Sequence, residues 1–336
     1  VLITLLIEAI GAAFIYLSLD KNALGSTSDN LKFSIFHSIS AFCNAGFSTL
    51  TDNLYDVRIR TNYSVHIWIA NLIVLGGIGF PVLLNLYHYC KCQVIWLGEF
   101  FTTRKAYVHR VNLVTLNSKI VMLTTFILIV FGSVAFFFFE KEATQQGMDL
   151  KARMAMSYFQ SISPRTAGFN NYAMSILSMP SVIITIFLMW VGASPVSAGG
   201  GIKTSTFAIA IMNTFRIMKG HNHIEINRYE IHEYSVNKAF AIITLSIFTI
   251  ILGSFGIFIF DGEYGMLRIM FESFSAFGTV GLSLDLTPKL SDPSKYILII
   301  LMYIGRMGSI TLLLALVRSY GSSSLYRYPK ENIIIT

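Results

Sequence analysis

Long apolar stretches separated by polar linkers dominate the chain. An α-helix needs roughly 20 mostly apolar residues to cross a bilayer. The stretches that meet this length, within a few residues, are 1–19, 64–89, 119–139, 178–217, 237–260 and 296–317. Between them lie shorter apolar segments that end in glycine and are too short to span, at 34–46, 156–168 and 266–281. The pattern predicts spanning helices that alternate with re-entrant segments.

The composition agrees with this pattern and excludes several classes of protein. Of the 336 residues, 54% are hydrophobic and 13% are charged, and the mean hydropathy is +0.62. About a quarter of a typical globular chain is charged, so this chain lacks the polar surface of a soluble enzyme. Cys43, Cys90 and Cys92 are too few for a disulfide framework or a four-ligand zinc site. A multi-pass membrane protein is expected.

The basic balance, a net charge of +7, is better explained by topology than by nucleic-acid binding. The linkers after the second, fourth and sixth stretches, together with the helix ends beside them, carry 12 Lys and Arg residues against five acidic residues, whereas the opposite side carries 10 basic and 12 acidic residues. Positively charged loops stay in the cytoplasm. The re-entrant segments are therefore predicted to enter from outside, and no cleaved signal peptide is expected because no charged region and cleavage site precede the first stretch.

The glycine-terminated segments align with one another. Residues 36–47 (FHSISAFCNAGF) parallel 271–282 (FESFSAFGTVGL) without a gap, and 159–169 (FQSISPRTAGF) fit after one deletion. Each segment has one span before it and one after it. The chain is therefore predicted to be an all-α polytopic membrane protein built from repeated helix–pore loop–helix units of the potassium-channel kind, in the regions 1–90, 119–217 and 237–318.

This unit has a physical use. A short helix that enters halfway points its partial negative C-terminus at the membrane centre, which favours a cation there. The extended residues that follow can turn backbone carbonyls inward and replace the water around K⁺, as in potassium channels. The expected filter residues are Asn44, Ala45, Gly46, Phe47, Thr166, Ala167, Gly168, Phe169, Thr279, Val280, Gly281 and Leu282.

The number of copies raises a question of closure. Potassium filters use four loops, and this chain has three of an expected four. A missing wall would expose unpaired backbone to lipid, which is costly. We therefore expect a first repeat to precede Val1 in the intact protein. The alternative is a genuine three-repeat protein.

Several motifs resemble the membrane subunits of the Ktr/Trk potassium uptake systems over nearly the whole chain. They are Asn44–Phe47, Ser163–Asn170, Gly192–Thr204, Ser275–Ser283 and Gly305–Gly308. The resemblance implies four repeats around one pore, of which this chain matches repeats two to four. It also implies a bacterial plasma membrane protein that transports K⁺ as a homodimer, gated by a cytosolic ring of nucleotide-binding RCK subunits. The ending 326–331 looks more like the Ktr branch than the Trk branch.

The resemblance leaves two questions about transport open. Symport with Na⁺ or H⁺ as the coupling ion is compatible with it. A non-selective or sodium-conducting channel of the same architecture is the alternative to K⁺ transport. No Ser/His/Asp set or metal cluster with suitable spacing occurs at bilayer depth, so no enzyme is expected.

The stretch 178–217 is about twice the length needed to cross and carries Pro195 and three glycines at its middle, which break a helix. A packing bend and a mobile gate are the two readings. The resemblance favours a gate made of Ala198, Gly199, Gly200, Gly201, Lys203 and Arg306. The run 199–204 superficially suggests a phosphate loop, but Ile202 stands where the Walker pattern needs glycine. No nucleotide is expected on this chain.

Four charged residues lie in or beside the predicted spans and loops, at Lys203, Arg306, Arg165 and Glu272. An intramembrane arginine such as Arg306 is expensive and faces a pore or a partner. The resemblance implies that Arg306 projects into the pore below the filter, and a carbonyl contact or salt bridge inside the bundle is the alternative. Lys203 is a candidate latch for the gate. Arg165 and Glu272 flank the loops and are candidates to pair beside the filter.

Overall fold

A computed structural model describes residues 2–20, 23–103, 114–221, 223–226 and 229–308, with the side chains of 95–103 excepted. The end of the sixth predicted span, the tail from 319 and part of the linker 91–118 lie outside these residues. The helices are α1 Leu2–Ser18, α2 Thr27–Phe42, α3 Tyr63–Gly77, α4 Phe80–Thr103, α5 Leu116–Phe139, α6 Leu150–Ile162, α7 Met179–Trp190, α8 Thr204–Met218, α9 Glu233–Asp261, α10 Met266–Gly278 and α11 Asp292–Met307. Short 3₁₀ turns span Asn53–Tyr55, Met174–Ile176, Gly262–Tyr264 and Thr287–Lys289, and a small antiparallel hairpin joins β1 Glu225–Ile226 to β2 Tyr229–Glu230.

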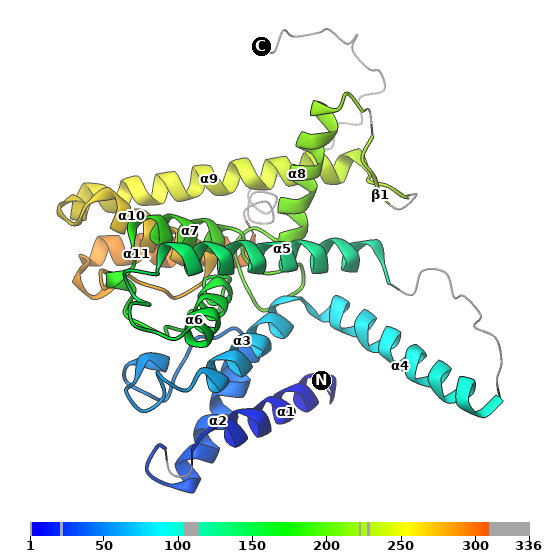
Figure 1. The fold of residues 1–336 in the computed structure, drawn as a ribbon. Helices are drawn as coiled ribbons and strands as arrows, with labels where there is room; N and C mark the ends of the chain where they lie inside the picture. The colour runs from blue at the N-terminus through cyan, green and yellow to red at the C-terminus, as the bar shows by residue number, and fades with distance from the viewer. Residues whose placement is uncertain (1, 21–22, 104–113, 222, 227–228, 309–336) are drawn as a thin grey trace, which may run out of the picture.

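The helices form three copies of one unit, α1–α2–α3, α5–α6–α7 and α9–α10–α11 (Figure 1). In each copy a short middle helix packs against the helix before it. The third helix of one copy packs against the middle helix of the next, α3 on α6 and α7 on α10. The copies therefore follow one another in a fixed order around a shared centre.

The middle helices begin earlier than the sequence predicts for the first two copies. Helix α2 begins at Thr27 and α6 at Leu150, ahead of the predicted starts at 34 and 156. The polar residues before the apolar run form the first turns, and at α2 the Ser26 side chain accepts a hydrogen bond from Asp29 N at 3.1 Å. Such a cap satisfies a backbone donor that the helix leaves free, so apolar pattern alone places the start too late.

The observed helices agree with some of the predicted spans and differ from others. In the described part of the chain, α5 and α9 are each long and apolar enough to cross a membrane. The stretch 64–89 is not one straight helix, because α3 and α4 meet at an angle of 102° at a short break. The bend lies at Gly79, whose φ of +93° is a conformation that residues with a Cβ rarely adopt. The predicted interruption of 178–217 is correct, since α7 and α8 are separate helices.

The apolar core consists of clusters inside single copies and of clusters that join neighbouring copies. One apolar cluster joins the first and second copies and includes Ile69, Phe159 and Phe169, and another joins the second and third and includes Met189 and Phe271. Large apolar side chains on the outer helices are exposed instead. Among them are Phe126, Phe131 and Phe138 on α5 and Phe248, Phe255 and Phe260 on α9. An apolar exterior over a packed interior is what a bilayer requires.

Candidate functional site

The three loops after the middle helices share one backbone pattern. In each loop, the glycine and the residue two places before it have positive φ. The angles are +50° and +73° at Asn44 and Gly46, +74° and +75° at Thr166 and Gly168, and +50° and +90° at Thr279 and Gly281. Alternating left-handed with other conformations lets successive carbonyls face the same side of a strand, which an ion-coordinating wall needs. The left-handed conformation costs free energy for residues with a Cβ. Its recurrence in all three loops therefore indicates a feature that the fold maintains.

The start of each loop is tied to a serine near the end of the preceding helix. The carbonyl of Ser40 accepts from Ala45 N at 2.8 Å, and that of Ser275 accepts from Val280 N at 2.9 Å. In the middle copy Ser163 accepts from the amide of Gly168 at 3.1 Å, and its hydroxyl donates to the Phe169 carbonyl. The same Ser163 carbonyl also accepts from Ala167 N at 3.1 Å, so the middle copy keeps the bond at the aligned position and adds a second one at the next residue.

The glycines set how closely neighbouring loops approach. A Cβ on Gly46 would collide with the carbonyl oxygen of Ala167, and a Cβ on Gly168 would collide with that of Val280. A Cβ on Gly281 would meet nothing within 4 Å. The loops therefore touch in the order first, second, third, and the series is open after the third.

A cavity of about 330 Å³ lies on this open side. Ala45 and Phe47 of the first loop line it together with Thr279, Val280 and Gly281 of the third. All twelve predicted filter residues thus belong to three neighbouring loops, with a gap between the first and the last.

Residues 191–203, here termed the crossing loop, lie directly against two of these loops. A Cβ on Gly199 would collide with Thr166 Oγ1, and one on Gly200 would come within 2.5 Å of Thr279 Oγ1. The loop folds back on itself between α7 and α8, with Ile202 N donating to Trp190 O at 3.1 Å. The predicted helix break therefore places Gly199 and Gly200 where a Cβ would have no room, and Gly201 where φ is +66°, a conformation that favours glycine.

Two cationic side chains hold the crossing loop by its carbonyls. Lys203 Nζ donates to Gly199 O at 2.5 Å, and Arg306 on α11 donates to Ala198 O. The gate residues predicted from the sequence are thus together in one place. Arg306 makes the carbonyl contact that we considered as the alternative to a purely pore-facing role.

The bend between α3 and α4 holds the other end of the crossing loop. Ser194 N donates to Gly77 O at 3.0 Å, and Phe80 N donates to Val196 O at 3.3 Å. A Cβ on Gly79 would lie 2.5 Å from the Pro195 carbonyl oxygen, which is an overlap between a carbon atom and backbone. Sequence reasoning missed this contact between the bend and the crossing loop. The signal that could have revealed it was the three glycines among residues 76–79, inside a predicted span.

The predicted pair of Arg165 and Glu272 is wrong. Glu272 instead accepts hydrogen bonds from the hydroxyls of Ser283 at 2.5 Å and Thr287 at 2.7 Å, which fixes the segment after the third loop to α10. Arg165 lies among residues of the first two copies. Hydroxyls 11 and 15 residues away in the same copy already bond the carboxylate, so no charge partner from another copy is needed.

Two buried carboxylates that sequence reasoning missed join the first and third helices of the second and third copies. Glu140 at the end of α5 accepts from both the amide (3.0 Å) and the hydroxyl (2.7 Å) of Ser178, which caps α7. Asp261 at the end of α9 accepts from Ser291, which caps α11, at the same two distances. The repeated Ser-x-Pro-Ser at 178–181 and 291–294 was the signal that could have revealed them.

The chain matches a known protein family and individual proteins. The profile of the TrkH family, described as a cation transport protein, matches residues 1–328. The Ktr system potassium uptake protein B of Vibrio alginolyticus is 33% identical over 332 residues, which are 98% of this chain and 68% of that protein. The potassium/sodium uptake protein NtpJ of Enterococcus hirae is 34% identical over 308 residues, 90% of this chain and 64% of that protein.

A solved structure shows the same fold. The potassium transporter TrkH from Vibrio parahaemolyticus superposes with a TM-score of 0.68 at 14% identity, over 93% of this chain and 70% of that one. The chain therefore spans about two thirds of the length of the proteins it resembles.

Proposed function

Because the chain belongs to the TrkH family of cation transport proteins, we propose that it forms the ion-translocating part of a bacterial potassium uptake system of the Ktr/Trk kind. The observation that carries this proposal is the recurrence of the same left-handed pair in three neighbouring loops. A wall of backbone carbonyls can replace the hydration shell of K⁺ without any acidic side chain. The residues of the proposed filter are those at 44–47, 166–169 and 279–282.

The proposed pore is closed by a fourth helix–loop–helix copy. Its loop would fill the cavity between Ala45 and Gly281, where the series of loops is open. Each existing contact joins a glycine to the carbonyl before the next glycine. By the same rule Gly281 would contact the fourth copy, and the glycine of the fourth copy would contact the carbonyl of Ala45.

The crossing loop is the proposed gate. It lies against Thr166 and Thr279, directly beneath two of the filter loops, and so stands in the path of an ion that leaves the filter. Lys203 and Arg306 keep it there by bonding its carbonyls, and their charges oppose a cation at the same level. Opening then requires a partner to break these bonds.

The proposed assembly is a homodimer in the plasma membrane, with a cytosolic RCK ring as the partner that moves the gate. K⁺ is cargo, and Na⁺ or H⁺ is a candidate coupling ion. A sodium-conducting protein of the same architecture is the second candidate, which the naming of a relative as a potassium/sodium uptake protein favours. Transport measurements distinguish K⁺ transport from Na⁺ conduction.

The full-length protein expressed in bacteria that lack their own K⁺ uptake systems provides the test. We expect growth at low external K⁺ and saturable K⁺ uptake, with a reversal potential in liposomes that follows the K⁺ gradient. A reversal potential that follows Na⁺ equally would replace the proposal with the second candidate. Absence of any cation flux from a correctly inserted protein would overturn both.

A further inference from the structure

Arg165 is a buried cation without a counter-charge in the described part of the chain. Only 7% of the surface of Arg165 is exposed, and its Nε–H group is buried without a hydrogen-bond partner. It follows α6 by three residues, and its own amide donates to Ile162 O at 3.0 Å. Guanidinium groups stay protonated in proteins, so a full positive charge sits beside the second filter loop, one residue before Thr166.

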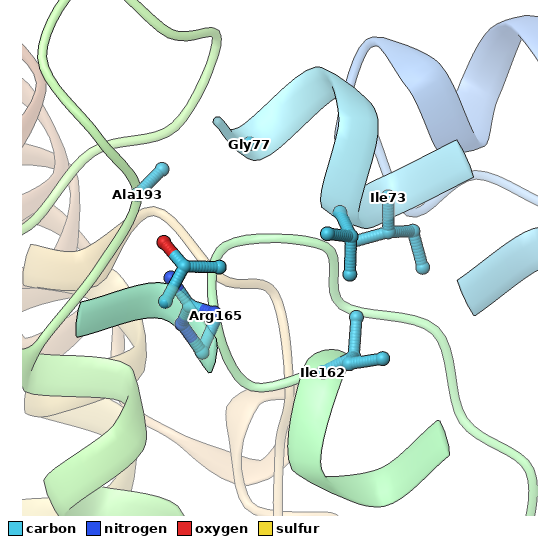
Figure 2. A pocket seen from close by; sticks show the side chains of 7 residues that line it. Ile73, Gly77, Ile162, Arg165 and Ala193 are labelled. Atoms are coloured by element: carbon cyan, nitrogen blue, oxygen red, sulfur yellow. The ribbon is translucent and has the colours of Figure 1, made fainter. Parts of the chain in front are cut away.

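A small cavity explains how the side chain is accommodated. Figure 2 shows Arg165 between Ile162 and Ala193, with Ile73 and Gly77 on the facing side. The cavity measures about 10 Å³, and Thr125 also lines it, with a buried hydroxyl that has no partner. One water molecule needs about this volume and at least two polar partners. Such a water would satisfy Arg165 Nε and Thr125 Oγ1, but being neutral it would leave the charge in place.

The position of this charge distinguishes the second copy from the others. A helix C-terminus carries about half a negative charge, which favours a cation in front of it. Helices α2 and α10 end at the uncharged residues Cys43 and Thr279, whereas the end of α6 is followed by Arg165. The guanidinium therefore offsets the dipole of α6 and makes this side of the central path less negative.

We propose that Arg165 sets the affinity of the filter, by weakening cation binding beside Gly168 so that a bound ion can leave. The proposal rests on the proposed function in K⁺ transport. Conduction requires binding that is favourable enough for entry and weak enough for exit. Arg165 touches no ion in this account and acts through the electrostatic potential at the filter.

The expected size of the effect follows from Coulomb's law. A unit charge about 10 Å from an ion, at an effective dielectric constant of about 20, changes binding by roughly tenfold. Neutralising Arg165 should thus lower the KM for K⁺ by about threefold to tenfold. Because ions then leave more slowly, the maximal rate should fall or stay level, but not rise.

The experiment uses the full-length protein and compares Arg165→Gln and Arg165→Met with Arg165→Lys. Both neutral variants should show the lower KM, and Arg165→Lys should restore the wild-type value because it keeps the charge. Binding of K⁺ to the purified protein, followed by calorimetry, should tighten in parallel. Two neutral side chains of different shape keep the test usable if one of them does not fold.

Arg153→Gln is the matched control. Arg153 lies in the first turn of α6, at the end away from Arg165, and donates to Phe137 O at 3.0 Å, so this variant removes one positive charge far from the filter loop. Its KM should not change. A wild-type KM in both neutral variants of Arg165 would overturn the inference, as would an equal shift in Arg165→Lys. Failure of the wild-type protein to transport K⁺ would instead overturn the proposed function.

Discussion

Replacing Gly168 with alanine tests the contact between neighbouring filter loops. Gly168 has a φ of +75°, and a Cβ there would overlap the backbone carbonyl of Val280. The left-handed conformation alone costs an alanine about 1–2 kcal/mol. The overlap adds to this cost, because a backbone carbonyl cannot swing aside as the end of a side chain can. We expect the third loop to shift and the Val280 carbonyl to leave its place in the filter.

The matched control is Gly147→Ala in the loop before α6. Gly147 has the same φ of +75°, but a Cβ there meets nothing within 4 Å. Both variants should therefore share the conformational cost, and only Gly168→Ala should disturb the filter. In K⁺ uptake by the full-length protein, Gly168→Ala should raise the KM at least about tenfold, equivalent to 1.4 kcal/mol. It should also admit more Na⁺.

Comparing the two variants shows whether an effect on transport comes from the contact between the loops or from lower stability. If Gly168→Ala kept the wild-type KM and Na⁺ exclusion while Gly147→Ala behaved the same, the proposed role of the loop contacts would be refuted. If both variants lost transport equally, loss of stability rather than filter geometry would be the cause. Thermal unfolding in detergent measures that stability directly.

Three further predictions concern the proposed gate, the buried carboxylate of Glu140 and the ion pair of Asp56 with Arg58. Arg306→Gln removes a bond to the crossing loop and should increase K⁺ flux without the partner subunit; lower flux in a proteoliposome assay would contradict a gating role. Glu140→Ala leaves several buried donors without an acceptor and should lower thermal stability by about 3 kcal/mol, whereas exposed Glu142→Ala should change it little. Hydrogen bonds from Arg58 lower the pKa of Asp56 to about 2. Stability from this pair should therefore be complete above about pH 4 and lost as the pH falls through 2, and Asp56→Asn should remove that dependence of acid unfolding.

Much of the architecture could be read from local pattern. Apolar stretches of membrane length and the repeated segment ending at Gly46, Gly168 and Gly281 were enough to predict the helices and loops. Both signals are local, because burial in lipid acts on each stretch separately and a left-handed position selects glycine wherever it occurs. The break in 178–217 was predictable for the same reason.

Contacts between distant segments could not be read this way. A straight span over 64–89 looked sound because Gly79 is compatible with either a helix or a bend, and the carbonyl of Pro195, over a hundred residues later, lies where its Cβ would be. The predicted pairing of Arg165 with Glu272 was wrong for a similar reason. Opposite charges show that two side chains could form an ion pair, but not that the fold brings them together. Nothing in the sequence marked Ser283 and Thr287 as the partners of Glu272.

The sequence by itself therefore determined the units: membrane helices, three glycine-ended loops, an interrupted helix and the cationic residues near it. Only the tertiary structure decided how they meet. It placed the crossing loop against Thr166 and Thr279, gave its carbonyls to Lys203 and Arg306, and left the series of loops open after Gly281. The reason is physical: periodicity and backbone preference are properties of neighbouring residues, whereas the room for a Cβ and the partner of a buried charge depend on whatever segment folding brings beside them.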